Sequence, residues 1–248
     1  GDISSSNARL LEMNQELDNF AGRVAHDLNS LCHIIQGFAG SLTRRANSKL
    51  DEQERRYLQR INESSARGGQ LVSDLLAFAR LGSGDLQHEQ VVLNEVVEKA
   101  RAQVEAGESL REVDWTIAIL PDIEGDESLL EQVFVNLLSN AMKFSQFREQ
   151  PCISVDANIQ NDCVEIRVID NGAGFDPDQA DGLFKPFHRL HNAHDFEGHG
   201  MGLANVKRII ERHGGQISAQ SVPDNGATFT LLLPLSQRDR GSVKQEIV

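Results

Sequence analysis

The chain has 248 residues, of which 40% are hydrophobic, and its 37 acidic and 24 basic residues give a formal net charge of −13. That charge argues against a nucleic-acid or anionic-membrane partner, because both attract basic patches. No apolar run approaches the roughly 20 residues of a membrane helix, and no basic-then-apolar leader precedes Asn7. The length fits one large or two modest domains. We therefore expect a cytoplasmic protein with no membrane segment in this chain.

The cysteines are odd in number and lack C-x-x-C spacing. They are Cys32, Cys152 and Cys163. This pattern favours reduced, buried thiols over a metal site or a disulfide.

The first third of the chain has helical periodicity. Residues 8–45 are predicted to form one long helix, in which Leu10, Leu17 and Val24 recur every seven residues. A seam this short needs a partner, so we expect a dimer or bundle.

A second helix is predicted over residues 51–80, after a break at Asn47 and Ser48. Two long helices with a short loop form an antiparallel hairpin, and two hairpins would make a four-helix bundle. The sequence Leu81-Gly-Ser-Gly84 is the expected linker to a second domain.

After this linker, strand-like and helix-like runs alternate, which predicts an α/β sandwich with one sheet covered by helices. Asn94 is expected to cap the first of the helices. The predicted strands are 91–93, 115–120, 153–159, 164–169, 217–221 and 228–233, and the predicted helices are 94–106, 127–145 and 204–213.

Three polar residues share one face of the 127–145 helix. Asn136, Asn140 and Lys143 are spaced i, i+4 and i+7. Amide oxygens suit Mg²⁺, and a lysine offers a point charge to phosphate, so the stripe suits a magnesium-bound polyphosphate. The alternative is a solvated polar face.

Asp170 ends a predicted strand and is followed by Gly172 and Gly174. A carboxylate at this place can accept a hydrogen bond from the exocyclic amine of a base, and the glycines let backbone approach a flat ring. Taken alone, the same letters also describe a common turn.

A second glycine cluster, Gly198, Gly200 and Gly202, leads directly into a predicted helix. This arrangement offers free N–H groups to phosphate. The long segment 175–197 before it is a candidate lid. Thr228, after Gly226, adds either a hydroxyl near the nucleotide or only a hairpin turn.

His26 is followed by the acidic residue Asp27 on the first helix. A neighbouring carboxylate can orient an imidazole and take its proton as the ring attacks phosphorus. Ser30, on the same face, either contacts the phospho-ligand or is an ordinary surface residue. His33 is the runner-up acceptor. Three further histidines lie in the candidate lid region: His191, His194 and His199. Exposed loop positions are favoured for them over zinc binding.

These segments together resemble the ATP-binding domain of sensor histidine kinases, in the wider group shared with gyrase, Hsp90 and MutL. The resemblance runs from about Val91 to Pro234 and rests on N-x-x-x-N-A-x-K-F, D-N-G-A-G, L-F-K-P-F and G-H-G-M-G-L. It implies magnesium at Asn136 and Asn140, phosphate at Lys143 and adenine at Asp170. The full set of implied ATP-binding residues is Asn136, Asn140, Lys143, Phe144, Asp170, Gly172, Gly174, Phe184, Phe187, Gly198, Gly200, Gly202, Leu203 and Thr228.

The segment H-D-L-N-S-L-C that starts at His26 is similar to the phospho-acceptor domain of the same family. It lacks the Arg and Pro of the commonest pattern, H-E-L-R-T-P-L, and looks more like the H-D-F-N-N-L-L variant. The resemblance implies His26 as phospho-acceptor, Asp27 as base or orienter and Ser30 as a possible phosphatase position. The region around residues 187–205 is also similar to the kinase modules of bacteriophytochromes.

The resemblance therefore implies a homodimeric histidine kinase that uses Mg²⁺ and ATP to phosphorylate His26. It also implies that the phosphoryl group then passes to an aspartate on a response-regulator receiver domain. The implied layout is a signalling helix over 1–14, a dimerisation and phosphotransfer domain over 15–82, a catalytic domain over 83–236 and a disordered tail over 237–248. An upstream sensor and a receiver are expected to lie outside this chain. One alternative is a pseudokinase or scaffold that acts by heterodimerisation, and another is an ATPase or protein-serine kinase without histidine chemistry.

Overall fold

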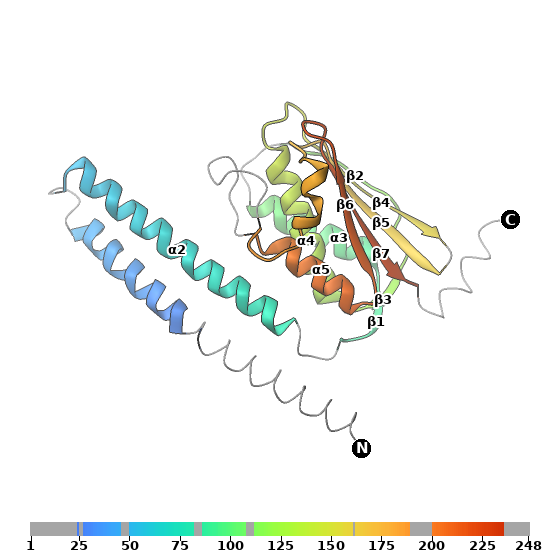
Figure 1. The fold of residues 1–248 in the computed structure, drawn as a ribbon, viewed down its shortest axis with the longest axis horizontal. Coiled ribbons are helices and arrows are strands. Elements are labelled where there is room, and N and C mark those ends of the chain that lie inside the picture. Colours follow the sequence, from blue (N-terminus) through green and yellow to red (C-terminus); the bar gives the residue numbers. More distant parts are fainter. Residues whose placement is uncertain are drawn as a thin grey trace, which may run out of the picture. The chain divides into compact units, whose positions relative to one another are not determined.

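The structure is a computed structural model that describes residues 24, 27–45, 50–81, 86–107, 112–160, 162–188 and 200–235. The chain divides into two compact units, Gly1–Gly84 and Asp85–Val248. The first is helical, and the second combines helices with a sheet (Figure 1). No helix within these described ranges is both long enough and apolar enough to cross a bilayer.

The first unit is an antiparallel pair of helices, which confirms the predicted hairpin. A helix over residues 27–45 packs against α2 (Glu52–Arg80). Ser65 Oγ donates to Cys32 O at 2.7 Å, and Asn29 Nδ2 donates to Ser73 Oγ at 3.2 Å. The seam positions Leu10 and Leu17 lie outside the described residues.

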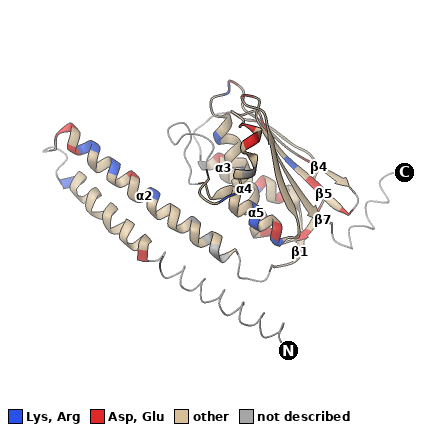
Figure 2. Ribbon diagram, in the orientation of Figure 1, with Lys and Arg blue, Asp and Glu red and all other residues tan. Residues whose placement is uncertain are grey.

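A capping box fixes the start of α2. Glu54 N donates to the Asp51 carboxylate at 2.8 Å, and Asp51 N donates to the Glu54 carboxylate at 2.9 Å. Each side chain thus satisfies a backbone N–H that has no partner inside the helix. Figure 2 shows that α2 carries both signs of charge.

The second unit contains a five-stranded sheet in the order β2-β4-β5-β7-β6 and a small ribbon, β1-β3. Neighbouring strands are antiparallel except β2 and β4, which are parallel. The elements in chain order are β1 (Glu89–Val91), α3 (Leu93–Gly107), β2 (Asp114–Ile117), β3 (Ile123–Gly125), α4 (Glu127–Ser145), β4 (Cys152–Gln160), β5 (Cys163–Asp170), the 3₁₀ helix η1 (Pro177–Gly182), α5 (Gly202–Arg212), β6 (Gln216–Ser221) and β7 (Ala227–Pro234).

The helices α3, α4 and α5 lie on one face of this sheet, and the core lies between the two layers (Figure 1). Alternate residues of β5 and β7 are buried, as a period of two requires. The buried side chains come from both layers and include Leu130, Phe134, Leu137, Ile153, Ile166, Ile209 and Leu231. The predicted fold class, a helical hairpin followed by an α/β sandwich, is confirmed.

Several local predictions differ from the structure. Leu93 opens α3 rather than ending a strand, and Asn94 does not cap that helix. Its amide instead donates to Ala118 O at 3.0 Å and accepts from Leu120 N at 2.8 Å. The predicted strand 115–120 stops at Ile117 because those two backbone groups bind Asn94. Two further elements, β3 and η1, were not predicted from the sequence.

All three cysteines are free, as expected, but their predicted burial is wrong. Cys163 is exposed, and Cys32 and Cys152 are half-buried.

Candidate functional site

Helix α4 presents the predicted polar stripe at the edge of the core. Asp126 caps its start by accepting from Leu129 N at 3.1 Å and Ser128 Oγ at 2.8 Å. Its apolar face is buried, so its register is fixed. The stripe residues Asn136, Asn140 and Lys143 are half-buried on the same helix, and Lys143 Nζ lies 4.5 Å from the ring centre of Phe144.

Asn136 and Gly202 lie against each other, although 66 residues separate them. Asn136 Nδ2 donates to Gln132 O at 2.8 Å, which leaves its amide oxygen toward the start of α5. A Cβ added at Gly202 would come within 2.6 Å of that oxygen. The helix α5 has no side-chain cap at Met201, and its first residue, Gly202, lies against Asn136 of the α4 stripe.

Asp170 is buried at the end of β5, with only 6% of its surface exposed. Its Oδ1 accepts from Gly172 N at 2.8 Å. Burial raises the pKa of Asp170 from 3.8 to about 6, against the opposing effects of the Gly172 and Ala227 N–H groups and the Arg148 charge. A carboxylate held at this cost is typical of functional sites.

The loop after Asp170 packs on the last turn of α4. Ala173 N donates to Phe144 O at 3.0 Å. A Cβ at Gly172 would lie 2.8 Å from that same oxygen, and a Cβ at Gly174 would overlap the Val222 carbonyl. Gly174 also has a φ of +65°. These two positions require glycine, so the predicted glycine loop and the α4 stripe are brought together.

The turn before β7 closes on the same aspartate. Gly226 has a φ of +83°, and a Cβ there would overlap the Asp170 carbonyl oxygen. Ser221 Oγ links the two segments, since it accepts from Phe175 N at 2.8 Å and donates to Gly226 O at 2.6 Å.

Thr228 is not brought to the buried face of this site. In the β5–β7 pairing, Asp170 lies opposite Ala227, and Thr228 lies opposite Ile169. Successive side chains in a strand point to opposite faces. The side chain beside Asp170 is therefore the methyl group of Ala227, and Thr228 is directed to the face without helices.

The predicted lid segment joins the second glycine cluster through backbone contacts. Phe187 N donates to Gly200 O at 3.0 Å, and both residues have positive φ, +62° and +74°. A Cβ at Gly200 would lie 2.7 Å from His188 O. Phe184 is half-buried and Phe187 is 52% exposed. Gly198 lies outside the described residues, and Leu203 is half-buried in the first turn of α5.

The candidate phospho-acceptor His26 also lies outside the described residues. Asp27 and Ser30 are exposed on the helix over residues 27–45. His33, the runner-up, forms a 2.8 Å hydrogen bond through Nδ1 with Asn29 O. Among the described residues, no group of three or more His, Cys, Asp or Glu is placed to hold a metal ion, and His191, His194 and His199 lie outside them.

Comparisons with known proteins agree on one family. Residues 125–237 match the family model described as histidine kinase-, DNA gyrase B- and HSP90-like ATPase, and residues 16–84 match the His Kinase A (phospho-acceptor) domain. The chain belongs to the sensor histidine kinase family. The structure of full-length ShkA, determined in complex with AMPPNP, is similar with a TM-score of 0.65 and 28% identity, over 88% of this chain and 46% of that one.

Among relatives of this histidine kinase, the phytochrome-like protein Cph1 of Synechocystis is 33% identical over 92% of the chain and 30% of its own length. Sensor protein KdpD of Escherichia coli is 32% identical over 93% of the chain and 26% of its own length. The chain thus spans about a third or less of the curated relatives it matches.

Two residues outside the predicted motifs tie together elements of this unit of the histidine kinase, and only the first of them contacts the loops around Asp170. Arg148 donates to three backbone carbonyls of the loops around Asp170. His213 is buried at the end of α5, where its Nε2 accepts from Asp126 N at 3.0 Å and its Nδ1 lies 2.8 Å from Ile209 O. His213 thereby ties α5 to the start of α4. Neither residue lies in a recognisable motif, because each acts on backbone atoms that are distant in sequence.

Proposed function

We propose that this chain is the catalytic module of a protein-histidine kinase, which transfers the γ-phosphoryl group of ATP to His26 and then to an aspartate of a response-regulator receiver domain. The observation that carries the proposal is the meeting of four separate segments around Asp170 and Asn136. They are the end of α4, the loop after β5, the start of α5 and the turn before β7. Their glycines leave no room for side chains at these contacts.

In this proposal Asp170 recognises the base. Its carboxylate accepts a hydrogen bond from the adenine amine, and this role accounts for a carboxylate that is buried despite its raised pKa. The N–H groups at the start of α5 and the Lys143 ammonium meet the phosphates. Segment 175–197, of which residues 189–197 lie outside the described ranges, is the proposed lid over the nucleotide.

The metal proposal is magnesium at Asn136 and Asn140. The fit rests on Asn136, whose amide nitrogen is engaged by Gln132 O and whose oxygen therefore faces the start of α5. Amide oxygen is a hard ligand of the kind Mg²⁺ accepts. Magnesium bound here would offset the charge that develops on the transferred phosphoryl group.

For the acceptor we propose that Asp27 orients His26 and takes its proton as the imidazole nitrogen attacks the γ-phosphorus of ATP, while the bond from that phosphorus to the β-phosphate oxygen breaks and ADP leaves. Asp27 is exposed, which leaves it accessible to an incoming nucleotide. Ser30 is exposed one turn away and is the proposed contact for a phosphatase reaction. We also propose a cytoplasmic location for the module, because the proposed reaction requires ATP.

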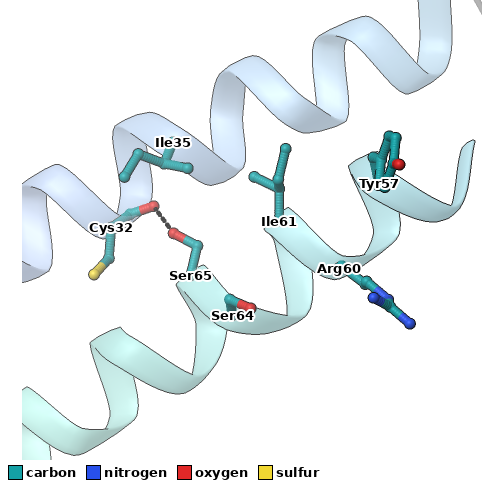
Figure 3. A pocket seen from close by; sticks show the side chains of 7 residues that line it. All are labelled: Cys32, Ile35, Tyr57, Arg60, Ile61, Ser64 and Ser65. Atoms are coloured by element: carbon teal, nitrogen blue, oxygen red, sulfur yellow. Dashed lines mark hydrogen bonds between the residues drawn. The ribbon is translucent and has the colours of Figure 1, made fainter. Parts of the chain in front are cut away.

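We also propose a homodimer through the hairpin. Large apolar side chains along both helices are exposed, among them Leu31 at 56%, Phe38 at 70% and Ile61 at 44%. An open groove of about 720 Å³ lies between the helices, and Figure 3 shows Ile35 and Ile61 from opposite helices directed into it beside the Ser65–Cys32 hydrogen bond. A second copy is the proposed occupant, because two hairpins complete a four-helix bundle.

The test is incubation with γ-labelled ATP and magnesium, with the wild type beside His26→Gln, followed by acid and alkali treatment. The proposal expects label that is lost in acid, survives alkali and is absent from His26→Gln. Acid-stable label would identify a serine or threonine kinase instead. Absence of label with nucleotide binding intact would favour the pseudokinase.

A further inference from the structure

Arg148 lies in the turn that follows α4 and is half-buried. Its Nε donates to Asn171 O at 2.7 Å, and its Nη2 donates to Gly172 O at 2.8 Å and to Asp224 O at 2.6 Å. The first two carbonyls belong to the loop after β5, and the third belongs to the turn before β7. One guanidinium therefore joins three segments of the chain.

The two loops that Arg148 joins also bind each other. Asp224 N donates to Ala173 O at 2.7 Å, and Asp224 adopts a φ of +61°, which is uncommon for a residue with a side chain. Ala173 in turn donates to Phe144 O at the end of α4. The backbone around Asp170 is thus a closed set of hydrogen bonds with Arg148 at its centre.

We propose that Arg148 is a positioning residue for base recognition: it locks the loop Asn171–Gly174 and the turn 222–226 in the arrangement that presents Asp170 to adenine. The inference rests on the proposed function of Asp170. Arg148 itself binds backbone carbonyls, so its role is to fix the geometry of a neighbour.

The chemistry of arginine explains why this residue suits the position. A guanidinium is planar and carries five N–H donors in a fixed fork, so it can reach several carbonyls in different directions. A lysine has the same charge but concentrates its donors on one atom. The Arg148 charge also lowers the pKa of Asp170 against the larger effect of burial, which favours the ionised acceptor.

The first experiment measures amide hydrogen exchange without nucleotide in the whole chain, with wild type beside Arg148→Gln. Exchange is expected to accelerate about tenfold or more in 171–175 and 222–226, because charge-assisted hydrogen bonds to those loops are lost. Helix α4 and strand β5 are expected to keep their protection. If Arg148→Gln exchanged at the wild-type rate in both loops, the positioning role of Arg148 would be overturned.

The matched control is Arg167→Gln. Arg167 is another arginine of the same unit, paired with Asp156 at 2.7 Å across the face of β4 and β5 that has no helices. Its side chain is 44% exposed, and an exposed pair contributes little stability. This variant is expected to leave exchange in 171–175 and 222–226 unchanged. The same acceleration in both variants would overturn a specific role for Arg148.

The second experiment compares ATP with inosine triphosphate, which replaces the adenine amine by an oxygen. Arg148→Gln is expected to weaken ATP binding about tenfold and inosine triphosphate binding much less, so the ratio of the two affinities falls. Arg148→Lys is expected to behave like Arg148→Gln. Full rescue of ATP affinity by Arg148→Lys would contradict the positioning role of Arg148. An unchanged ratio of ATP to inosine triphosphate affinity in Arg148→Gln would contradict it as well.

The two experiments separate this inference from the proposed function. If the wild type bound no ATP, the kinase proposal would fail. The hydrogen exchange would still test whether Arg148 holds the two loops in place. If the wild type bound ATP and preferred it over inosine triphosphate, an unchanged preference in Arg148→Gln would overturn the positioning role alone.

Discussion

The two units of this histidine kinase treat their apolar side chains in opposite ways. In the hairpin, Leu31, Ile34 and Phe38 are each more than half exposed. In the second unit, Phe134, Ile166 and Leu231 are fully buried between helices and sheet. A contiguous exposed apolar surface marks an interaction site. The second unit therefore completes its own core, whereas the hairpin requires another surface to complete its core.

The largest expected effect is on dimerisation through the apolar surface of the hairpin. Ile35→Asp, in the groove of Figure 3, is expected to weaken dimerisation about a thousandfold or more, because burying an unpaired carboxylate costs several kcal/mol. Light scattering during size-exclusion chromatography measures the mass. The control is Ile119→Asp, at a position 93% exposed in the second unit, which is expected to stay dimeric. A dimeric Ile35→Asp would contradict the proposed interface.

Glycine substitutions are expected to have opposite effects on stability in the two units, because Gly226 is crowded and Gly37 is not. Gly226→Ala is expected to lower the unfolding free energy by about 3 kcal/mol, since the new Cβ overlaps the Asp170 carbonyl at a positive φ. Gly37→Ala, on the hairpin helix with no atom within 4 Å of the new Cβ, is expected to stabilise by up to about 1 kcal/mol. Chemical denaturation measures both. Equal effects would show that the loop tolerates a side chain.

Asp170→Asn separates stability from function in the second unit. Burial raises the folded pKa to about 6, so the ionised carboxylate destabilises the fold above that pH. The variant is expected to gain up to about 3 kcal/mol at pH 8, and the gain is expected to shrink as pH falls from 6 to 4. ATP affinity is expected to fall about tenfold to a hundredfold. The control is Asp156→Asn, whose side chain is half-buried in its pair with Arg167 and which should gain nothing. A pH-independent gain would contradict the burial argument.

His213 provides the smallest of these effects. Burial lowers its pKa, although the Ile209 carbonyl and Asp126 act in the opposite direction. The fold therefore favours the neutral ring, and the stability it contributes is present above pH 6.5 and lost as pH falls below that value. His213→Gln is expected to lose about 1 to 2 kcal/mol at pH 7.5 and less at pH 5, as measured by urea denaturation. A loss that grows toward pH 5 would contradict the assignment.

The regular elements were predictable from the sequence because their patterns are local. The predicted bounds of α4 agree with the structure, since its apolar residues repeat at helical spacing and Asp126 caps it. The strands β4 to β7 follow from their period of two. The strand β3 and the true role of Asn94 were not predictable, because both depend on partners far along the chain.

The site was predictable where glycines and motif spacing reveal it, and less so elsewhere. Gly202 lies against Asn136 and Gly172 lies against Phe144, so segments that the motifs had singled out are close together in the fold. The face to which Thr228 points depends on the register between β5 and β7, which the sequence alone did not supply. Arg148 and His213 bind backbone atoms. Because every residue type has a backbone carbonyl, the sequence does not reveal which residues are their partners.

The most direct test of the account maps the phosphorylated residue. The wild-type chain is incubated with ATP and magnesium, digested at neutral pH and analysed by mass spectrometry under conditions that preserve phosphohistidine. The account predicts phosphate on His26. Phosphate on His33, or on a serine or threonine, would contradict it.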